Sequence, residues 1–217
     1  MTEIEFQPSG LASLRVARRV EALMPEAIAA VERHLGETVP PLTVVIAGRT
    51  GLATAQTLAA GWRTAGLGAA ARYWWDCRQN APEFLACTTV TRTDRIMIAF
   101  NSSQLRRRPE EIRATVVHEV VHAVQIGRPG RRGELQSELD HNLRIAEMPA
   151  GLRQVMEAVR AIEEAEAYRV EAALAPEAGE QSAFDRAAVL HRLLDAAARW
   201  DAAAEAAETG LVKAGAS

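Results

Sequence analysis

Hydrophobic positions along the first half of the chain alternate between helical and strand-like patterns. Residues 9–35 carry apolar side chains near helical spacing, and Gly36 follows as a stop signal, so the sequence predicts a first helix there. Pro25 inside this stretch predicts a kink or a break into two shorter helices. The short apolar run Leu42–Ala47 is typical of a buried strand.

The next part of the chain predicts a short helix and a β-hairpin. Leu52–Ala60 has the pattern of a short helix, and the glycine-punctuated remainder is expected to form a loop. Within it, the aromatic cluster Tyr73-Trp74-Trp75 is expected to pack in the core under that loop. The alternative is that it forms a wall of a substrate groove. Glu83–Thr91 and Arg95–Asn101 are rich in β-branched residues, which predicts two paired strands. The second strand leads almost directly into the next helix.

From Glu134 onward the pattern is nearly all helical, so the chain is predicted to have an α+β fold. We interpret it as a single domain, with an α/β part at residues 1–133 and a helical part at residues 134–217. The last predicted helix either completes the core or forms a contact between two copies in a homodimer. The three candidate helices of this part are residues 134–147, 150–174 and 181–208.

The stretch with the clearest chemistry is the predicted helix Ile112–Gln125, written IRATVVHEVVHAVQ. In it His118, Glu119 and His122 form an H-E-x-x-H motif. Residues four apart on a helix lie on the same face, so both imidazoles can reach one metal ion at roughly 2.0–2.1 Å. Glu119 is placed to reach a metal-bound water rather than the metal.

The surroundings of this motif argue against a chance match. The chain has only five histidines among 217 residues, and the motif is enclosed by valine and alanine. A helix that is apolar on most sides is buried, and buried imidazoles need polar partners, which a metal ion supplies. The sequence therefore predicts a metal site, with Zn²⁺ as the ion.

His118-Glu119-Val120-Val121-His122, followed by Gln125, resembles the active-site helix of zincin metallopeptidases. A third histidine six residues after the second, as in metzincins, is absent because that position is Arg128. The resemblance covers about residues 95–175 and points to the gluzincin side. It implies a zincin-like fold with a small sheet packed on the motif helix, a third ligand that is a glutamate on a later helix, and a substrate strand added beside Arg95–Asn101.

Two glutamates remain candidates for the third ligand. Glu164-Ala165-Glu166-Ala167 resembles the E-x-E-A pattern of gluzincin-like families, whose first glutamate binds the metal, although Tyr168 stands where those families often have Asp or Asn. Helical geometry instead places Glu163 on an apolar stripe, where a carboxylate needs a partner. Glu164 shares a face with other charged residues, which also fits a salt-bridged surface ladder; these residues are Arg153, Glu157, Arg160 and Glu171. The pattern favours Glu164, and Glu163 stays open.

Other polar residues are weaker candidates. His141 is expected to be a surface residue or a partner of a ligand, and either His141 or Tyr168 is a candidate for stabilising an oxyanion. Asp140 lacks the flanking pattern of aspartate-ligand variants, and His191 falls too deep in the last helix. The arginines at 106–108, 128, 131 and 132 are expected to be solvated, with a basic rim for acidic substrates as the alternative.

Composition narrows the partners and the compartment. The net charge of −3 gives no reason to expect nucleic acid or an anionic membrane. Neither a signal peptide nor an apolar run of about 20 residues occurs, so the expected compartment is the cytoplasm. Cys77 and Cys87 are expected to be free thiols rather than a disulfide.

These observations predict a zinc-dependent hydrolase, and more specifically a metallopeptidase acting on a peptide or protein. His118, His122 and either Glu164 or Glu163 would hold the ion, and Glu119 would act as general base and then general acid. The alternative is a metallopeptidase-like sensor or binding module with one dedicated protein partner.

Overall fold

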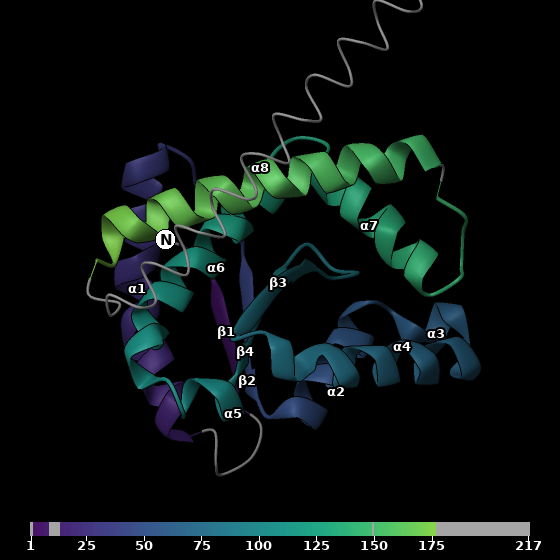
Figure 1. Ribbon diagram of the computed structural model, residues 1–217, viewed down its shortest axis with the longest axis horizontal. Coiled ribbons are helices and arrows are strands. Elements are labelled where there is room, and N and C mark those ends of the chain that lie inside the picture. The colour runs from purple at the N-terminus through teal and green to yellow at the C-terminus, as the bar shows by residue number, and fades with distance from the viewer. Residues whose placement is uncertain (1, 9–13, 149, 177–217) are drawn as a thin grey trace, which may run out of the picture.

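The computed structural model describes residues 2–8, 14–148 and 150–176, and it shows a mixed α+β fold (Figure 1). The fold class expected from the sequence is therefore confirmed. The strands are β1 (Ile4–Pro8), β2 (Leu42–Ala47), β3 (Ala86–Val90) and β4 (Ile96–Asn101). The helices are α1 (Leu14–Leu35), α2 (Arg49–Ala59), α3 (Trp62–Ala65), α4 (Leu67–Asn80), α5 (Ser102–Leu105), α6 (Ile112–Gly127), α7 (Arg131–Asn142) and α8 (Ala150–Leu174), with 3₁₀ turns η2 (Ala81–Glu83) and η3 (Pro109–Glu111).

The four strands form one sheet in the order β1-β2-β4-β3. β1, β2 and β4 run parallel, whereas β3 pairs antiparallel with β4. The hairpin predicted around Arg92-Thr93-Asp94 is thus confirmed. The antiparallel strand β3 lies at the edge of the sheet, next to α6.

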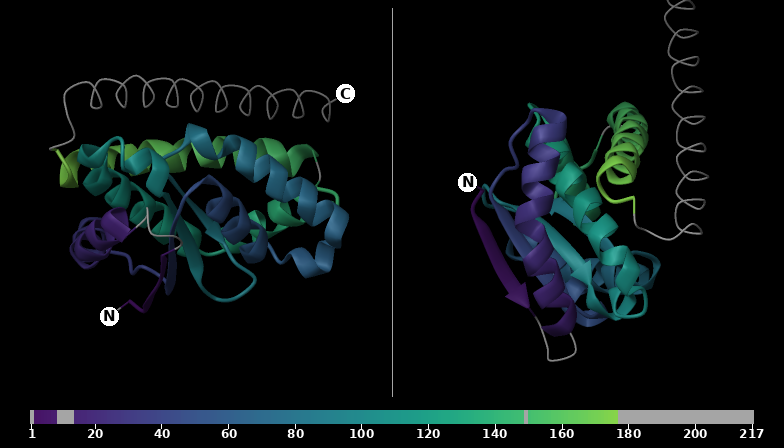
Figure 2. Two further views of the ribbon diagram at one scale, coloured as in Figure 1. Left: turned by 90° about the horizontal axis from the view of Figure 1, so that it is seen from below. Right: turned by 90° about the vertical axis from the view of Figure 1, so that its left-hand side faces the viewer.

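Each face of the sheet packs against helices (Figure 2). On one face α1 and α6 lie side by side, and their valines meet Val44, Ile46 and Ile98 in the larger core. On the other face, α2 covers a smaller core that contains Val45 and Met97. The apolar side chains of β2 and β4 therefore alternate between two buried layers, which explains why both strands are apolar along their whole length.

α6 is the central helix of the molecule. Of its 16 residues, 12 are buried, because the sheet, α1 and α8 all pack against it. α8 crosses it on the side away from α1 (Figure 2), and its bounds coincide with the helix predicted at residues 150–174. The prediction for residues 134–147 is shifted, because α7 begins at Arg131 and ends at Asn142.

The observed secondary structure differs from the sequence-based expectation at three places. α1 is one continuous helix through Pro25 rather than two, since Pro25 lies on its exposed face, where water can hydrogen-bond the carbonyl that the proline leaves free. Residues 62–65 and 67–80 are helical rather than loop, with Gly61 and Gly66 at positive φ separating the helices. Ile4–Pro8 forms a strand that was not predicted, although Ile4 and Phe6 alternate with polar residues as a half-buried strand requires.

The aromatic cluster lies on α4. Tyr73 packs against the larger core, as expected, but Trp75 is 52% exposed. Trp74 donates its indole N–H to the hydroxyl of Thr54 at 3.1 Å, and the guanidinium of Arg78 lies against both tryptophan rings. None of these three aromatic residues lines the cleft described below.

Among the described helices, none is both long and apolar enough to cross a membrane. The helix predicted at residues 181–208, and with it the homodimer contact, lies outside the described residues.

Candidate metal centre

His118 and His122 project from one face of α6 and meet Glu164 of α8. The two Nε2 atoms are 3.0 Å apart. The Glu164 carboxylate lies 3.5 Å from Nε2 of His118 and 3.3 Å from Nε2 of His122. Tetrahedral zinc ligands at roughly 2.0–2.1 Å from the ion are about 3.3 Å from one another. The three side chains therefore form a group that can hold a metal ion.

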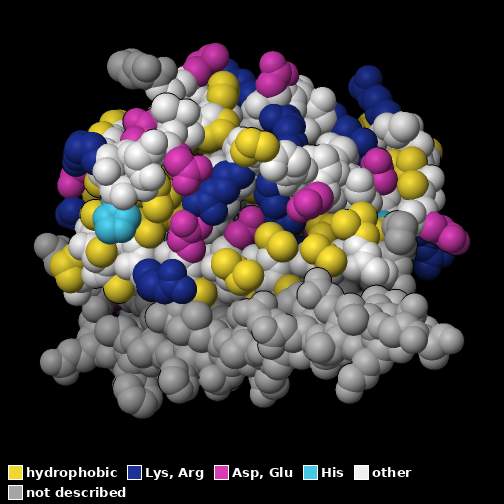
Figure 3. Space-filling model, turned by 90° about the horizontal axis from the view of Figure 1, so that it is seen from above, with side chains coloured by type: hydrophobic (Ala, Val, Ile, Leu, Met, Phe, Trp, Pro, Cys, Tyr) yellow, Lys and Arg dark blue, Asp and Glu magenta, His cyan; other side chains and the backbone are white. Residues whose placement is uncertain are grey.

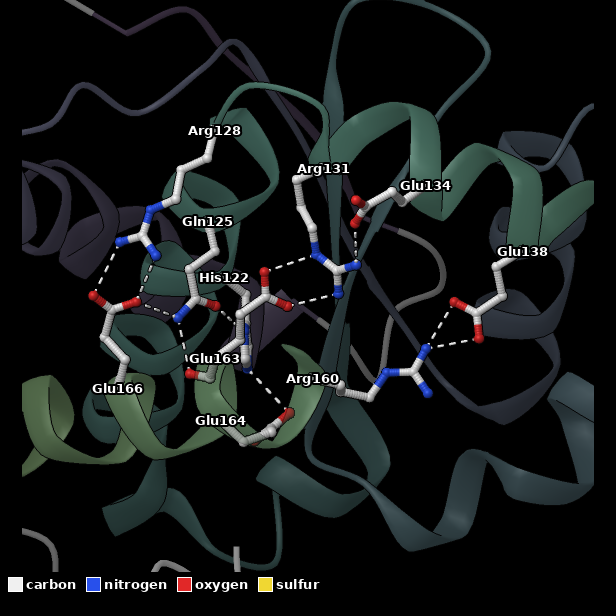
Figure 4. A network of polar contacts seen from close by, with 10 residues as sticks. All are labelled: His122, Gln125, Arg128, Arg131, Glu134, Glu138, Arg160, Glu163, Glu164 and Glu166. Atoms are coloured by element: carbon white, nitrogen blue, oxygen red, sulfur yellow. Dashed lines mark hydrogen bonds and ion pairs between the residues drawn. The ribbon is translucent and has the colours of Figure 1, made fainter. Parts of the chain in front are cut away.

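Glu163, the rival candidate, points to Arg131 (Figure 4). Its two carboxylate oxygens each accept a hydrogen bond of 2.7 Å from the guanidinium of Arg131. Arg131 is itself buried, at 6% exposure. Glu163 was a candidate because a carboxylate on an apolar stripe needs a partner, and Arg131 is that partner. Glu164 is the glutamate that lies next to the imidazoles.

Gln125 determines which nitrogen of His122 carries the proton. The Gln125 amide donates to the backbone carbonyl of Glu163 and to the carboxylate of Glu166, both at 2.8 Å. Because those groups only accept, the NH₂ end of Gln125 faces them, and its oxygen faces Nδ1 of His122 at 2.7 Å. Nδ1 must then be the donor. In the neutral ring, this leaves a lone pair on Nε2, aimed at the shared site.

Glu171 performs the same role for His118. Its carboxylate lies 3.0 Å from Nδ1 of His118, and its side chain is only 5% exposed. Both rings thus make their Nδ1 contacts with acceptors, and both Nε2 lone pairs face one another. Such an arrangement is unfavourable without a cation between them, whereas it is the usual arrangement of metal-ligating histidines. The side chains present therefore fit a metal ion.

Neither the role of Glu171 nor the hydrogen bonds of Gln125 follow from the sequence pattern. Glu171 was grouped with a charged surface ladder, but it is buried, because α6 covers that face of α8. The available signal was its spacing of seven residues from Glu164, which places both on one face two turns apart. Tyr168 lies between them, and its ring packs against His118 with centroids 4.7 Å apart.

The two imidazoles favour the ionised form of the Glu164 carboxylate. Burial by itself would raise the pKa of Glu164. Hydrogen bonds from imidazoles whose Nε2 carries a proton in place of a metal ion, together with the charge of those imidazoles, outweigh burial and hold that pKa well below its ordinary value. The carboxylate is therefore ionised at neutral pH and available as an anionic ligand.

Glu119 lies beside the triad at the floor of an open cleft of about 800 Å³. The side chains of all three triad members line this cleft, as do Tyr168 and Glu171. Its other walls are η2, the first half of β3, η3 and parts of α7 and α8. Glu119 is 5% exposed, and one of its carboxylate oxygens accepts a hydrogen bond of 2.6 Å from the hydroxyl of Thr88.

The strand that borders the cleft is β3, not β4. The expectation that Arg95–Asn101 forms the edge was wrong, because β4 lies between β2 and β3. The chain turns back after β3, so that β4 lies inside the sheet and pairs with both β2 and β3. A substrate strand can therefore add only beside β3 on this side of the sheet.

The backbone of β3 alternates between β4 and the open edge. Asn101 donates its backbone N–H to the carbonyl of Leu85 at 2.8 Å, so these two residues form a bonded pair. Bonded pairs recur at every second residue of an antiparallel ladder, so Cys87 and Thr89 also bond to β4. The backbone amides and carbonyls of the alternate residues, Ala86 and Thr88 among them, consequently point outward.

Most arginines near the cleft are paired with acids (Figure 4). Arg128 binds Glu166 and Glu37; these hydrogen bonds, that with Glu166 foremost, raise the pKa of Arg128 and lower that of Glu166. Arg160 binds Glu138 at 2.7 Å. On the face shown in Figure 3, basic and acidic side chains are accordingly interspersed.

The expectation of solvated arginines therefore held only in part. Arg128 and Arg131 are partly or fully buried in ion pairs, and Arg132 donates to the backbone carbonyl of Asp94 at 2.8 Å. The run 106–108 is exposed, as expected, and Arg108 lines the cleft.

The remaining sequence candidates lie apart from the triad. His141 accepts a hydrogen bond from the backbone N–H of Met148 and contacts Arg153, so it neither binds nor supports the metal group. Asp140 forms an ion pair with Arg92, and His191 lies outside the described residues. Both cysteines are free, as expected, and burial raises the pKa of Cys87 to about 12.

Comparisons with models of protein families, with curated proteins and with solved structures found no match to this chain. The metal centre is therefore supported by its own geometry. The resemblance to zincins rests on motif residues of α6 and α8 alone. The structure brings three of these residues, His118, His122 and Glu164, together.

Proposed function

We propose that this protein is a zinc-dependent hydrolase of the zincin type, and specifically a metallopeptidase. The observation that carries the proposal is the convergence of two Nε2 lone pairs and one ionised carboxylate at the floor of an open cleft. Three protein ligands with an open fourth position are typical of catalytic rather than structural zinc sites.

The chemistry requires one contribution from the metal and several from the protein. A bound Zn²⁺ lowers the pKa of its water and polarises the scissile carbonyl. His118, His122 and Glu164 hold the ion, and Gln125 and Glu171 fix the orientation of the two rings. Glu119 takes the proton from the attacking water at its carboxylate and then donates it to the leaving nitrogen.

The walls of the cleft favour a peptide over a small ester or amide. Ala86 and Thr88 present outward-facing backbone amides and carbonyls beside the triad. An extended peptide can pair with them as a fifth strand, so that main-chain hydrogen bonds give affinity and side chains give specificity. The scissile bond then lies next to Glu119.

The first experiment is zinc content per chain, by mass spectrometry, for the wild type and for Glu164→Ala and Glu163→Ala. We expect about one zinc in the wild type, none in Glu164→Ala, and retained zinc in Glu163→Ala, because Glu163 is bound to Arg131. The two neighbouring substitutions remove the same atoms and so control for each other. Wild-type protein that takes up no added zinc would overturn the proposal.

Hydrolysis is tested separately with Glu119→Gln and His122→Ala on a library of peptides. Glu119→Gln should retain zinc and lose at least 100-fold in kcat, because the amide cannot accept the proton. His122→Ala should lose both zinc and hydrolysis. A wild type that binds zinc and one copurifying protein, but cleaves neither it nor any peptide, would instead indicate the sensor or binding module.

A further inference from the structure

The edge strand contacts the proposed general base directly. The Oγ1 of Thr88 lies 2.6 Å from Oε2 of Glu119 and 3.2 Å from the backbone carbonyl oxygen of the same residue. A hydroxyl has one proton to donate, and the carboxylate is both the nearer and the stronger acceptor. The hydroxyl therefore donates to the Glu119 carboxylate and selects one of its orientations.

Thr88 is also one of the residues whose backbone faces the open edge. The register of β3 against β4 points the Thr88 amide and carbonyl away from β4, while its side chain points to α6. Threonine is β-branched, so its χ1 is stiff and the direction of the hydroxyl follows the direction of the backbone. The position of the Glu119 carboxylate is thereby tied to the position of the strand.

We propose that Thr88 is a positioning residue, which holds the Glu119 carboxylate and couples it to the occupancy of the β3 edge. The proposal rests on the hydrolase function proposed above. A peptide that pairs with the Thr88 backbone orders this strand, and the hydroxyl transmits that order to the group that receives the proton of the attacking water. Thr88 would then serve both functions, because its backbone pairs with the substrate and its hydroxyl aligns the base.

The contact itself is tested in metal-free protein with a double-mutant cycle between Thr88→Val and Glu119→Ala, read by thermal unfolding. Valine replaces the hydroxyl with a methyl group of similar size. We expect Thr88→Val to lower Tm by about 4 °C in the wild-type background and by much less in the Glu119→Ala background. Additive shifts would show that the two side chains are not coupled and would overturn the proposal.

Thr89→Val is the matched control. It makes the same chemical change one residue further along β3. The side chain of Thr89 points to the opposite face of the sheet, and Thr89 does not line the cleft. Its effect on Tm should be the same in both Glu119 backgrounds.

Function is tested with zinc-loaded Thr88→Val and Thr88→Ser. Thr88→Val should retain one zinc per chain and lose about tenfold in kcat with KM changed less than about twofold, since the base is misplaced but the edge backbone is intact. Thr88→Ser, which keeps the hydroxyl, should recover most of that loss. Unchanged kcat in Thr88→Val, or no recovery in Thr88→Ser, would overturn the positioning role while leaving the hydrolase assignment in place. A wild type without hydrolysis would instead overturn both.

Discussion

Each imidazole of the metal centre makes a hydrogen bond through Nδ1, and that contact determines which nitrogen can bind a metal. Gln125 lies against His122 and Glu171 against His118. Both partners are buried, so water competes little for these contacts. Zinc affinity at this site should therefore depend on two side chains that do not touch the ion.

Glu171 gives a matched pair of variants for this effect. Glu171→Leu should weaken zinc binding by about 10–100-fold, because Nδ1 of His118 loses its acceptor. Glu171→Gln keeps an oxygen of similar position and should lose less. Competition with a coloured chelator measures both affinities. Equal affinities in Glu171→Leu and wild type would show that the Glu171 contact does not orient the ring.

At the scale of elements, contacts made by the residue before it hold Glu164, the proposed third ligand, in place. Glu163 is bound to Arg131 at the start of α7, and the backbone carbonyl of Glu163 accepts from Gln125 on α6. One turn of α8 is thus fixed against two other helices. The hydrogen bond from Gln125 is to the Glu163 backbone, so it persists in Glu163→Ala and keeps Glu164 facing the histidines there.

Breaking this tie should destabilise the fold without removing the metal ligands. Glu163→Ala leaves the buried Arg131 with Glu134 alone and should lower the free energy of unfolding by about 3 kcal/mol. The double variant Arg131→Met with Glu163→Leu removes both charges and should recover much of that loss. Urea denaturation followed by circular dichroism measures the difference. A double variant less stable than Glu163→Ala would contradict the view that the loss arises from the unpaired charge of Arg131.

At the scale of the whole molecule, the metal would link the helical C-terminal part to the sheet-bearing part. The histidines lie on α6, which packs on the sheet, and Glu164 lies on α8, which packs mainly against α6. A ligand that binds the folded state alone stabilises it by mass action. Zinc should then act on global stability as well as on chemistry.

Thermal unfolding with and without zinc tests this link. Free zinc at roughly 1,000 times its Kd should stabilise the wild type by about 4 kcal/mol, which raises Tm on the order of 10 °C for a chain of this size. Glu164→Ala should show no comparable rise. An equal rise in both proteins would locate the zinc elsewhere.

Local patterns were sufficient for a defined part of this structure. The shared face of His118 and His122, the bounds of α8 and the β3–β4 hairpin all follow from helical or strand periodicity and from nearby stop signals. The same local logic failed where an exposed proline was tolerated within α1 and where alanine-rich residues after Gly66 continued as helix. In α1 the packing of its buried face on α6 offsets the cost of the proline. After Gly66 the glycines suggested a loop, although alanine has the highest helix propensity.

By itself, the sequence determined that the two imidazoles project together, because residues four apart on one helix must share a face. It left the third ligand open between Glu163 and Glu164, which differ by about 100° around α8. The tertiary structure brings Glu164 to the imidazoles and pairs Glu163 with Arg131. It likewise decided that β3 forms the edge and that Gln125 and Glu171 support the histidines, because strand order and helix rotation depend on contacts between residues far apart in the chain.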